Sequence, residues 1–390
     1  MTSILLKNVT VILPDNILEN INILVENRRI TNISTEDLTA DKIIDFNNQT
    51  LYAGFIDIHN HGAVGIDTNE ANVDEFIEVG KFLAKNGVAA WLPTFVPDSD
   101  KNYRRQIETL EKLREIQNDL PIAQVVGVHY EGVFANTQMC GALRPQYFKT
   151  FTGNELSELP TLKNAVHHTT YAPEIEGGIE LTKELAKQGW IPSIGHTKAN
   201  FETLENAFTA GAKHITHLFN AMTGVHHRDL GVAGWSLTKD EIKCEIIADK
   251  IHVHPKILKM AGETKPSDKL ILVSDSVSPT GLGDGDFEIW GEKVSVVSGK
   301  TNNERGSIAG SVITMRDAVK NMLSLGFTPL EVSKMASANP AKLLGIEKDF
   351  GSIEVGKRAD LVALDEKGNV TFLMVGGKIV DLNINRYSER

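Results

Sequence analysis

The stretch Gly54-Phe55-Ile56-Asp57-Ile58-His59-Asn60-His61-Gly62 decides the fold of this 390-residue chain. It is a short apolar run bounded by glycines, and two histidines stand at its end. Such a run predicts a buried strand. Residues two positions apart on a strand point to the same face, roughly 6.5 Å apart along it. His59 and His61 are therefore expected to reach one metal ion.

Further apolar runs follow this one, and helical stretches alternate with them. The runs lie at 89–94, 125–129, 191–195, 214–216, 244–248 and 270–274. The helical stretches lie at 73–86, 101–117, 177–188, 200–210, 255–262, 314–325 and 329–337. This alternation predicts a parallel sheet with helices outside it. Its length favours an α/β fold of the (β/α)8 TIM-barrel type over residues 54–345. No glycine-rich dinucleotide fingerprint follows a run, which weakens the alternative of an open doubly wound sheet.

Short β-type runs return at both ends of the chain. Residues 1–53 include the β-branched run Val9-Thr10-Val11-Ile12-Leu13, and residues 346–390 include Ala359-Asp360-Leu361-Val362-Ala363-Leu364. Runs of this kind bounded by turn residues predict strands. We expect the two segments to pair into one small β-sandwich that flanks the barrel.

Composition narrows the class of protein. The net charge of −11 lacks the basic balance of a nucleic-acid or acidic-membrane binder. The two cysteines, Cys140 and Cys244, exclude a disulfide scaffold and suit a reducing compartment. The N-terminus lacks the pattern of a signal peptide, and no apolar run approaches the length of a membrane span. A cytoplasmic protein is the expectation.

Ligand-type residues stand at the ends of five of the predicted strands. They are His59, His61, Glu131, His196, His217 and Asp275. Each one alone is more often a structural residue, but in a barrel these strand ends converge on one mouth. Histidine and carboxylate without cysteine suit zinc, iron, manganese or cobalt. Such an ion lowers the pKa of bound water and polarises a carbonyl. Asp275 is then expected to carry the proton.

In this order, these residues and their surroundings resemble the amidohydrolase superfamily, and within it the deacetylases of N-acetylhexosamine 6-phosphates. The resemblance covers nearly the whole chain. Its segments are 54–62, 129–132, 172–174, 195–197, 216–222, 308–311 and 351–361. The run Thr216-His217-Leu218-Phe219-Asn220-Ala221-Met222 is the most specific to that group. The resemblance implies hydrolysis of N-acetylglucosamine 6-phosphate to glucosamine 6-phosphate and acetate.

The resemblance also implies roles for single residues. Glu131, His196 and His217 would hold the main metal ion, zinc first among the candidates, and His59 with His61 would help to hold a second. Asp275 would be the general acid and base. Further residues would contact the sugar phosphate: His252, Asn220, Ala221, Ala309 and Arg228, the last through the phosphate. A homodimer is implied as well, with some phosphate contacts crossing its interface.

Three positions depart from the family pattern. Val133 stands where proline is usual, Leu143 where histidine or glutamine is common, and Lys250 where glycine is frequent. A leucine cannot hydrogen-bond a sugar hydroxyl, so Leu143 bears on the identity of the sugar. N-acetylgalactosamine 6-phosphate and other amides are therefore alternative substrates. An inactive scaffold would be expected to lack a ligand or Asp275, and none is missing.

The remaining histidines are given structural interpretations. His167, His168, His226 and His227 are expected to be exposed rather than ligating. His254 precedes Pro255 and is expected to begin a helix.

Overall fold

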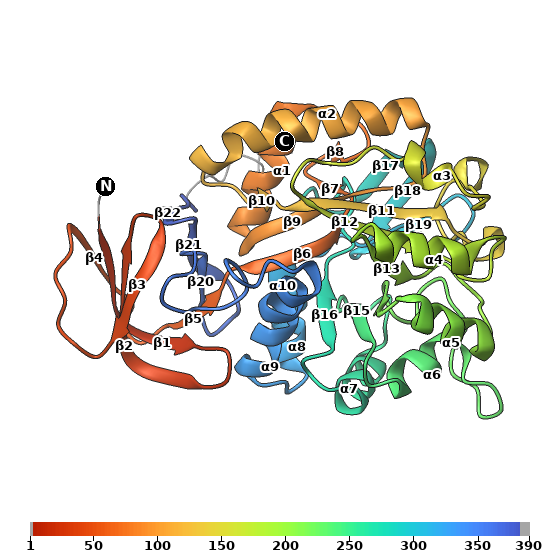
Figure 1. Ribbon diagram of the computed structural model, residues 1–390. Coiled ribbons are helices and arrows are strands. Elements are labelled where there is room, and N and C mark those ends of the chain that lie inside the picture. Colours follow the sequence, from red (N-terminus) through yellow and green to blue (C-terminus); the bar gives the residue numbers. More distant parts are fainter. Residues whose placement is uncertain (1–2, 383–390) are drawn as a thin grey trace.

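The computed structural model describes residues 3–382. The outermost residues of the predicted flanking module, 1–2 and 383–390, lie outside the described residues. Figure 1 shows a barrel of strands surrounded by helices, with a smaller group of strands from both ends of the chain beside it.

Eight parallel strands form the barrel and follow one another in chain order. They are β6 (Phe55–Asn60), β9 (Val88–Phe95), β11 (Gly127–Phe134), β12 (Val166–Tyr171), β13 (Ile191–Ile194), β14 (His214–Ile215), β15 (Lys243–Ile247) and β16 (Leu270–Val273). The short strand β10 (Gln124–Val125) precedes β11. The circle closes where the Asp275 amide donates to the His59 carbonyl, at 2.9 Å. The predicted barrel is confirmed.

Helices follow most of these strands and cover the outside of the barrel (Figure 1). They are α1 (Val73–Lys85), α2 (Asp100–Ile116), α3 (Glu155–Glu158), α4 (Gly178–Lys187), α5 (Phe201–Ala210), α6 (Gly231–Thr238), α7 (Pro255–Thr264), α8 (Met315–Ser324), α9 (Pro329–Ser333) and α10 (Asn339–Leu344). Capping boxes fix three of the starts, at Asn72, Thr314 and Thr328. His254 is the N-cap of α7, as predicted, and its ring accepts a hydrogen bond from the Lys256 amide.

Helices α3, α6 and α10 lie outside the predicted helical stretches, and α6 shows most clearly why. Most of its residues are buried, and its apolar side chains point in all directions rather than along one stripe. Without a polar face the helical period cannot be read from the sequence.

The two ends of the chain form one mixed sheet beside the barrel. Its strands are β1 (Ile4–Ile12), β2 (Ile17–Glu26), β3 (Arg29–Ser34), β4 (Lys42–Asp45), β5 (Thr50–Ala53), β20 (Leu361–Leu364), β21 (Val370–Val375) and β22 (Lys378–Ile379). Strand β5 pairs antiparallel with β20 and joins the two ends. The sheet curls so that its edge strand β3 meets the segment just before β20. There the Ile30 amide donates to the Lys357 carbonyl, and the Ala359 amide donates to the Arg28 carbonyl. We propose residues 53/54 and 345/346 as the boundaries between this module and the barrel.

An unpredicted insertion follows the last barrel strand. It is a three-stranded antiparallel sheet of β17 (Gly285–Ile289), β18 (Glu292–Val297) and β19 (Lys300–Asn303). A smaller ribbon of β7 (Gly62–Ala63) and β8 (Ile66–Asp67) follows the first barrel strand. Both insertions follow the C-terminal ends of their barrel strands, where enzymes of this architecture carry their sites.

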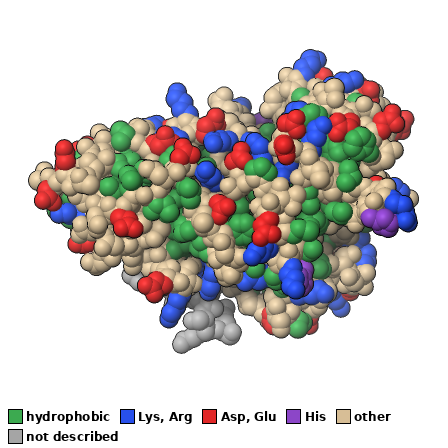
Figure 2. Space-filling model, turned by 90° about the horizontal axis from the view of Figure 1, so that it is seen from below, with side chains coloured by type: hydrophobic (Ala, Val, Ile, Leu, Met, Phe, Trp, Pro, Cys, Tyr) green, Lys and Arg blue, Asp and Glu red, His purple; other side chains and the backbone are tan. Residues whose placement is uncertain are grey.

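Charged side chains of both signs are interspersed over the face in Figure 2, which shows no continuous basic patch. Within residues 3–382, no helix combines the length and the apolar character that crossing a membrane requires.

Candidate metal centre and active site

The first predicted ligand group meets around one carboxylate. The Nε2 atoms of His196 and His217 lie 3.1 and 3.0 Å from Oε1 of Glu131. All three side chains are buried. Glu131 lies within strand β11, which continues past the predicted strand end to Phe134. His196 and His217 lie two residues after the last residues of β13 and β14.

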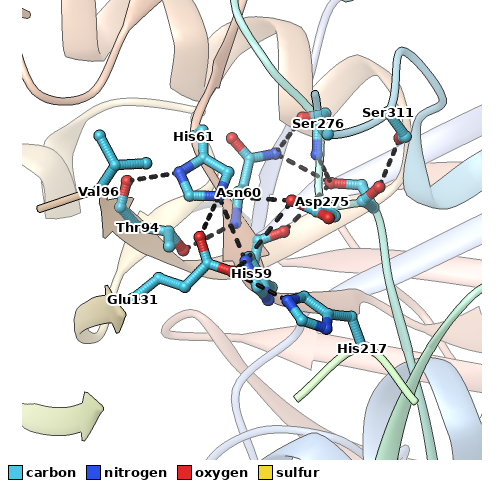
Figure 3. Close-up of polar contacts among 12 residues, drawn as sticks. His59, Asn60, His61, Thr94, Val96, Glu131, His217, Asp275, Ser276 and Ser311 are labelled. Carbon is cyan, nitrogen blue, oxygen red and sulfur yellow. Dashed lines mark hydrogen bonds and ion pairs between the residues drawn. The ribbon is translucent and has the colours of Figure 1, made fainter. Parts of the chain in front are cut away.

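The second group adjoins the first through the same carboxylate. The Nε2 atoms of His59 and His61 lie 3.3 and 3.2 Å from the two oxygens of Glu131. They also lie 3.5 and 3.4 Å from Oδ1 of Asp275. Figure 3 shows these side chains pointing toward one another from β6, β11 and the end of β16. The structure thus brings together all six residues that the sequence singles out.

Hydrogen bonds on the far side of three rings determine what each ring presents to the centre. The Nδ1 atom of His196 faces the Met139 carbonyl at 2.8 Å, and that of His61 faces the Thr94 carbonyl at 3.2 Å. Nδ1 of His59 lies 3.0 Å from a carboxylate oxygen of Glu245. Carbonyl and carboxylate oxygens only accept, so each Nδ1 carries the hydrogen.

When Nε2 carries no proton, as a metal ligand must, each ring directs the lone pair of this atom toward the carboxylates at the centre. Lone pairs and carboxylate oxygens packed within 3.5 Å of one another need a positive charge between them. This donor set suits a divalent transition-metal ion.

Backbone conformation marks the same positions. His196, His217 and Asp275 have φ angles of 48°, 30° and 48°, in the left-handed region that side chains other than glycine rarely adopt. Such strain clusters at functional sites. Lys250 also has a positive φ, of 67°. Glycine adopts this conformation freely, which explains why glycine is frequent at this position in the family pattern.

The charges of the cluster are complementary. Burial alone raises the pKa of Glu131, but the neighbouring histidines, His59 first, outweigh it and hold the pKa well below its ordinary value. Burial likewise opposes ionisation of Asp275, yet His59 and His61 keep its pKa lowered. Burial lowers the pKa of His59, while the carboxylates of Asp275 and Glu131 raise it well above normal. Both carboxyl groups are thus held as carboxylates.

A cavity of about 260 Å³ opens onto this cluster. Among the predicted substrate residues, His252, Asn220 and Ala221 line it. The His252 ring is held by Asp249, whose Oδ2 lies 2.6 Å from Nδ1. The cavity is near the lower end of the range for small-molecule sites, which suits a single sugar.

Two predicted substrate residues do not line this cavity. Ala309 is buried, and its neighbours Ile308 and Gly310 line the wall in its place. Arg228 lies in an exposed loop, where its Nη1 contacts Nε2 of His227 at 2.7 Å. Leu143 lines the cavity at a position where the family has a polar side chain.

Several residues of the site were not identified from the sequence. Glu245 was placed within a strand, but its carboxylate bonds to His59. Trp290 lies at the turn between β17 and β18, and its ring approaches that of His61 at 5.2 Å. A carboxylate inside an otherwise apolar strand was the available signal for Glu245, because a buried charge needs a partner.

The expectation that His168 is exposed is wrong, because its side chain is fully buried. Adjacent residues of a strand point to opposite faces. His167 therefore packs outward on Trp190, with ring centroids 4.9 Å apart, while His168 stacks on His129 at 4.1 Å.

Comparison with known proteins agrees with this geometry. The model of the amidohydrolase family matches residues 50–380. The N-acetylglucosamine-6-phosphate deacetylase of Bacillus subtilis is 32% identical over 97% of each chain. The N-acetylgalactosamine-6-phosphate deacetylase of Escherichia coli O157:H7 is 33% identical over 85% of this chain and 88% of its own. A mutant N-acetyl-D-glucosamine-6-phosphate deacetylase of Mycobacterium smegmatis, solved with N-acetyl-D-glucosamine-6-phosphate, superposes with a TM-score of 0.88 at 27% identity. That match covers 97% of this chain and 100% of the other.

Proposed function

The chain belongs to the amidohydrolase family, and from that premise we propose that it deacetylates N-acetylglucosamine 6-phosphate to glucosamine 6-phosphate and acetate. The observation that carries this function is the meeting of two histidine pairs and two carboxylates beside a sugar-sized cavity. Relatives named for this reaction share about a third of their residues with the chain over nearly its whole length.

We assign the main ion to Glu131, His196 and His217 and a second ion to His59 and His61, with zinc the first candidate and iron, manganese and cobalt the others. Such an ion, when bound, lowers the pKa of water and polarises the amide carbonyl. The proximity of the two groups across Glu131 supports a place for two ions.

Asp275 is assigned as the group that moves the proton. Its carboxylate lines the cavity and lies beside both His59 and His61. It takes a proton from the attacking water and delivers it to the departing sugar nitrogen, which leaves as the amine. His252, held in place by Asp249, lines the same cavity and is assigned to the oxygen of the acetamide.

The sugar phosphate contacts are assigned to Asn220 and Ala221 and to the segment around Ala309, whose neighbours Ile308 and Gly310 line the same cavity. Arg228 suits a phosphate because its guanidinium binds two oxygens at once. Since Arg228 is exposed and does not line its own cavity, we assign it to the cavity of a second subunit in a homodimer. Both cysteines are free, which suits the reducing cytoplasm.

N-acetylgalactosamine 6-phosphate is the second candidate substrate. The relative named for that sugar is as similar as those named for the gluco sugar. Leu143 also stands on the cavity wall, where no hydroxyl can be hydrogen-bonded by its side chain.

Acetate release from the two sugar phosphates tests the proposal, measured with the purified chain before and after treatment with a chelator. We expect higher kcat/KM for the gluco sugar and loss of activity without metal. Equal turnover after complete metal removal would contradict the mechanism. A higher kcat/KM for the galacto sugar would identify N-acetylgalactosamine 6-phosphate as the preferred substrate, with the same deacetylation chemistry.

A variant of the phosphate-binding arginine separates sugar phosphates from other amides. Arg228→Ala is expected to raise KM tenfold or more, about 1.4 kcal/mol or above, since it removes a charge-assisted contact. Arg104→Ala, which removes another exposed arginine, serves as the matched control. An unchanged KM for Arg228→Ala would exclude its role in phosphate binding.

A further inference from the structure

A ring of polar side chains lies inside the barrel beside the metal ligands, and His59 belongs to both groups. Its links are Thr94–His129 at 3.3 Å, His129–Thr170 at 2.7 Å, Thr170–Thr216 at 2.7 Å, Thr216–Ser193 at 2.6 Å, Ser193–His214 at 2.8 Å, His214–Glu245 at 3.8 Å and Glu245–His59 at 3.0 Å. The ring closes through the residue after His59, because the backbone amide of Asn60 donates to the Thr94 hydroxyl, at 2.9 Å.

The position of this ring is unusual for its chemistry. Barrel interiors are filled mainly by branched apolar side chains, whereas all these side chains are polar and buried. Thr170 on β12 bonds to Thr216 after β14, which lies beyond the intervening strand β13. The two side chains can meet only inside the barrel. Burying so many polar groups is unfavourable unless they hydrogen-bond to one another, as most members of this ring do.

Glu245 is the only member of this ring within the described residues that carries a carboxylate. Its side chain is fully buried. Its Oε2 atom lies 3.0 Å from Nδ1 of His59 and 3.2 Å from the amide nitrogen of His217. Its backbone carbonyl also accepts from the Leu218 amide, at 2.9 Å. One glutamate thus contacts a residue from each of the two ligand groups.

The contact with His59 has a consequence for metal binding. A carboxylate can only accept, so it fixes the hydrogen of His59 on Nδ1 and leaves the lone pair of Nε2 facing Glu131 and Asp275. Carboxylates in this position orient a ligating histidine and increase its basicity. By contrast, Nδ1 of His61 faces only the backbone carbonyl of Thr94. In the His59–His61 pair, only the Nδ1 atom of His59 therefore bonds to a charged group, the carboxylate of Glu245.

We propose that Glu245 positions His59 and thereby determines whether the His59–His61 pair holds a second metal ion. The inference rests on the metal assignment of the proposed function, but not on the substrate. Glu245 touches neither the cavity nor the reacting atoms, so it acts through His59. On the other side, Oε1 of Glu245 lies 3.8 Å from Nε2 of His214, whose Nδ1 lies 2.8 Å from the Ser193 hydroxyl.

The number of ions bound by each chain tests the proposal. The parent, Glu245→Gln and Glu245→Ala proteins are stripped of metal, reloaded with Zn²⁺ or Mn²⁺ and analysed by elemental analysis and calorimetric titration. We expect two ions in the parent and one in Glu245→Ala after dialysis. Glu245→Gln keeps the shape but not the charge and should bind the second ion about 10 to 100 times more weakly. The spin-coupled signal of an Mn²⁺ pair should be lost together with that ion.

Two controls make the result specific. Thr170→Val removes a buried polar member of the same ring that does not touch His59, and it should keep two ions. His61→Ala should lose the second ion, as Glu245→Ala does. Circular dichroism checks the fold, and if Glu245→Ala does not fold, Glu245→Gln carries the test.

Several outcomes would overturn the role of Glu245. One is parent-like affinity for both ions in Glu245→Gln, and another is equal ion loss in Thr170→Val. A parent chain that binds one ion would overturn both this role and the two-ion assignment. Because the readout needs no sugar, failure of the proposed substrate leaves the result interpretable.

Discussion

Asp275 is held by its backbone at the point where its side chain is needed. Its amide donates to the His59 carbonyl at 2.9 Å, and its carbonyl accepts from the Ser311 amide at 2.7 Å. These two bonds fix the left-handed conformation that directs the carboxylate into the cavity. The side chain can therefore be changed without loss of the backbone that supports it.

Replacing this carboxylate should affect chemistry more than binding. Asp275→Asn is expected to lower kcat by about 10² to 10⁴, the range for loss of a proton-transfer group, and to change KM little. Steady-state acetate release measures this, with Asp286→Asn in the exposed hairpin as the control. A kcat close to that of the parent would remove Asp275 from the mechanism.

His167 offers a residue-level test of stability, away from the site. Its ring stacks on Trp190, and its Nε2 accepts from the Leu162 amide at 2.9 Å. Burial, with some help from Arg114, lowers the pKa of His167 to about 4, from 6.5 when it is free. Below pH 6.5 the unfolded chain therefore binds a proton that the folded chain rejects, so folding becomes less favourable as the pH falls.

The His167→Gln variant isolates this contribution. The free energy of unfolding, measured with urea at pH 7.5 and pH 5, should fall more in the parent than in His167→Gln. The glutamine at position 167 does not titrate in this pH range. An equal fall in the two proteins would show that folding does not lower the pKa of His167.

At the scale of elements, most of the regular βα units were predictable, but strand β12, helix α6 and the insertions were not. β6 was readable because its apolar run is short, bounded by glycine and followed by two ligand-type residues. Strands β17 and β18 do alternate apolar and polar residues, at Phe287 and Ile289 and at Val294 and Val296, but over so few positions that the pattern was overlooked. Glu245 and His129 were missed as site residues for a related reason. Their partners lie on strands that only the closed barrel brings near.

The hairpin of β17 and β18 contributes an aromatic wall to the cavity. Trp290 lines it and lies against His61. Trp290→Ala should raise KM about tenfold by removing apolar surface from the bound sugar, with a smaller effect on kcat. Trp290→Phe retains a ring and should recover most of the binding. Unchanged KM in the alanine variant would place the sugar elsewhere in the cavity.

At the scale of the whole molecule, the metal centre ties the strands of the barrel together. Ligand-type side chains from β6, β11 and the ends of β13, β14 and β16 meet there. An ion that binds only the folded chain stabilises it by about 4 kcal/mol at a thousand times its Kd. The centre is thus expected to support the fold as well as the chemistry.

Metal removal should therefore act on stability and activity together. After dialysis against a chelator we expect a lower Tm and no acetate release, and zinc or manganese should restore both. Elemental analysis confirms removal, and calorimetry follows Tm. A Tm that stays constant once the ions are gone would show that the ligand side chains are held by the barrel alone.

The pairing of β5 with β20 sets an order of events during protein synthesis. Ala53 bonds in register with Leu361, so the first strands leave the ribosome long before their partners are made. Their apolar side chains, such as Leu51 and Val11, stay without the cover of β20 and β21 until residues 361–375 have been translated. The barrel can form first, and the flanking sheet is then the last part to close. Stalled or shortened nascent chains would expose these strands, and chaperones would be expected to recognise them there.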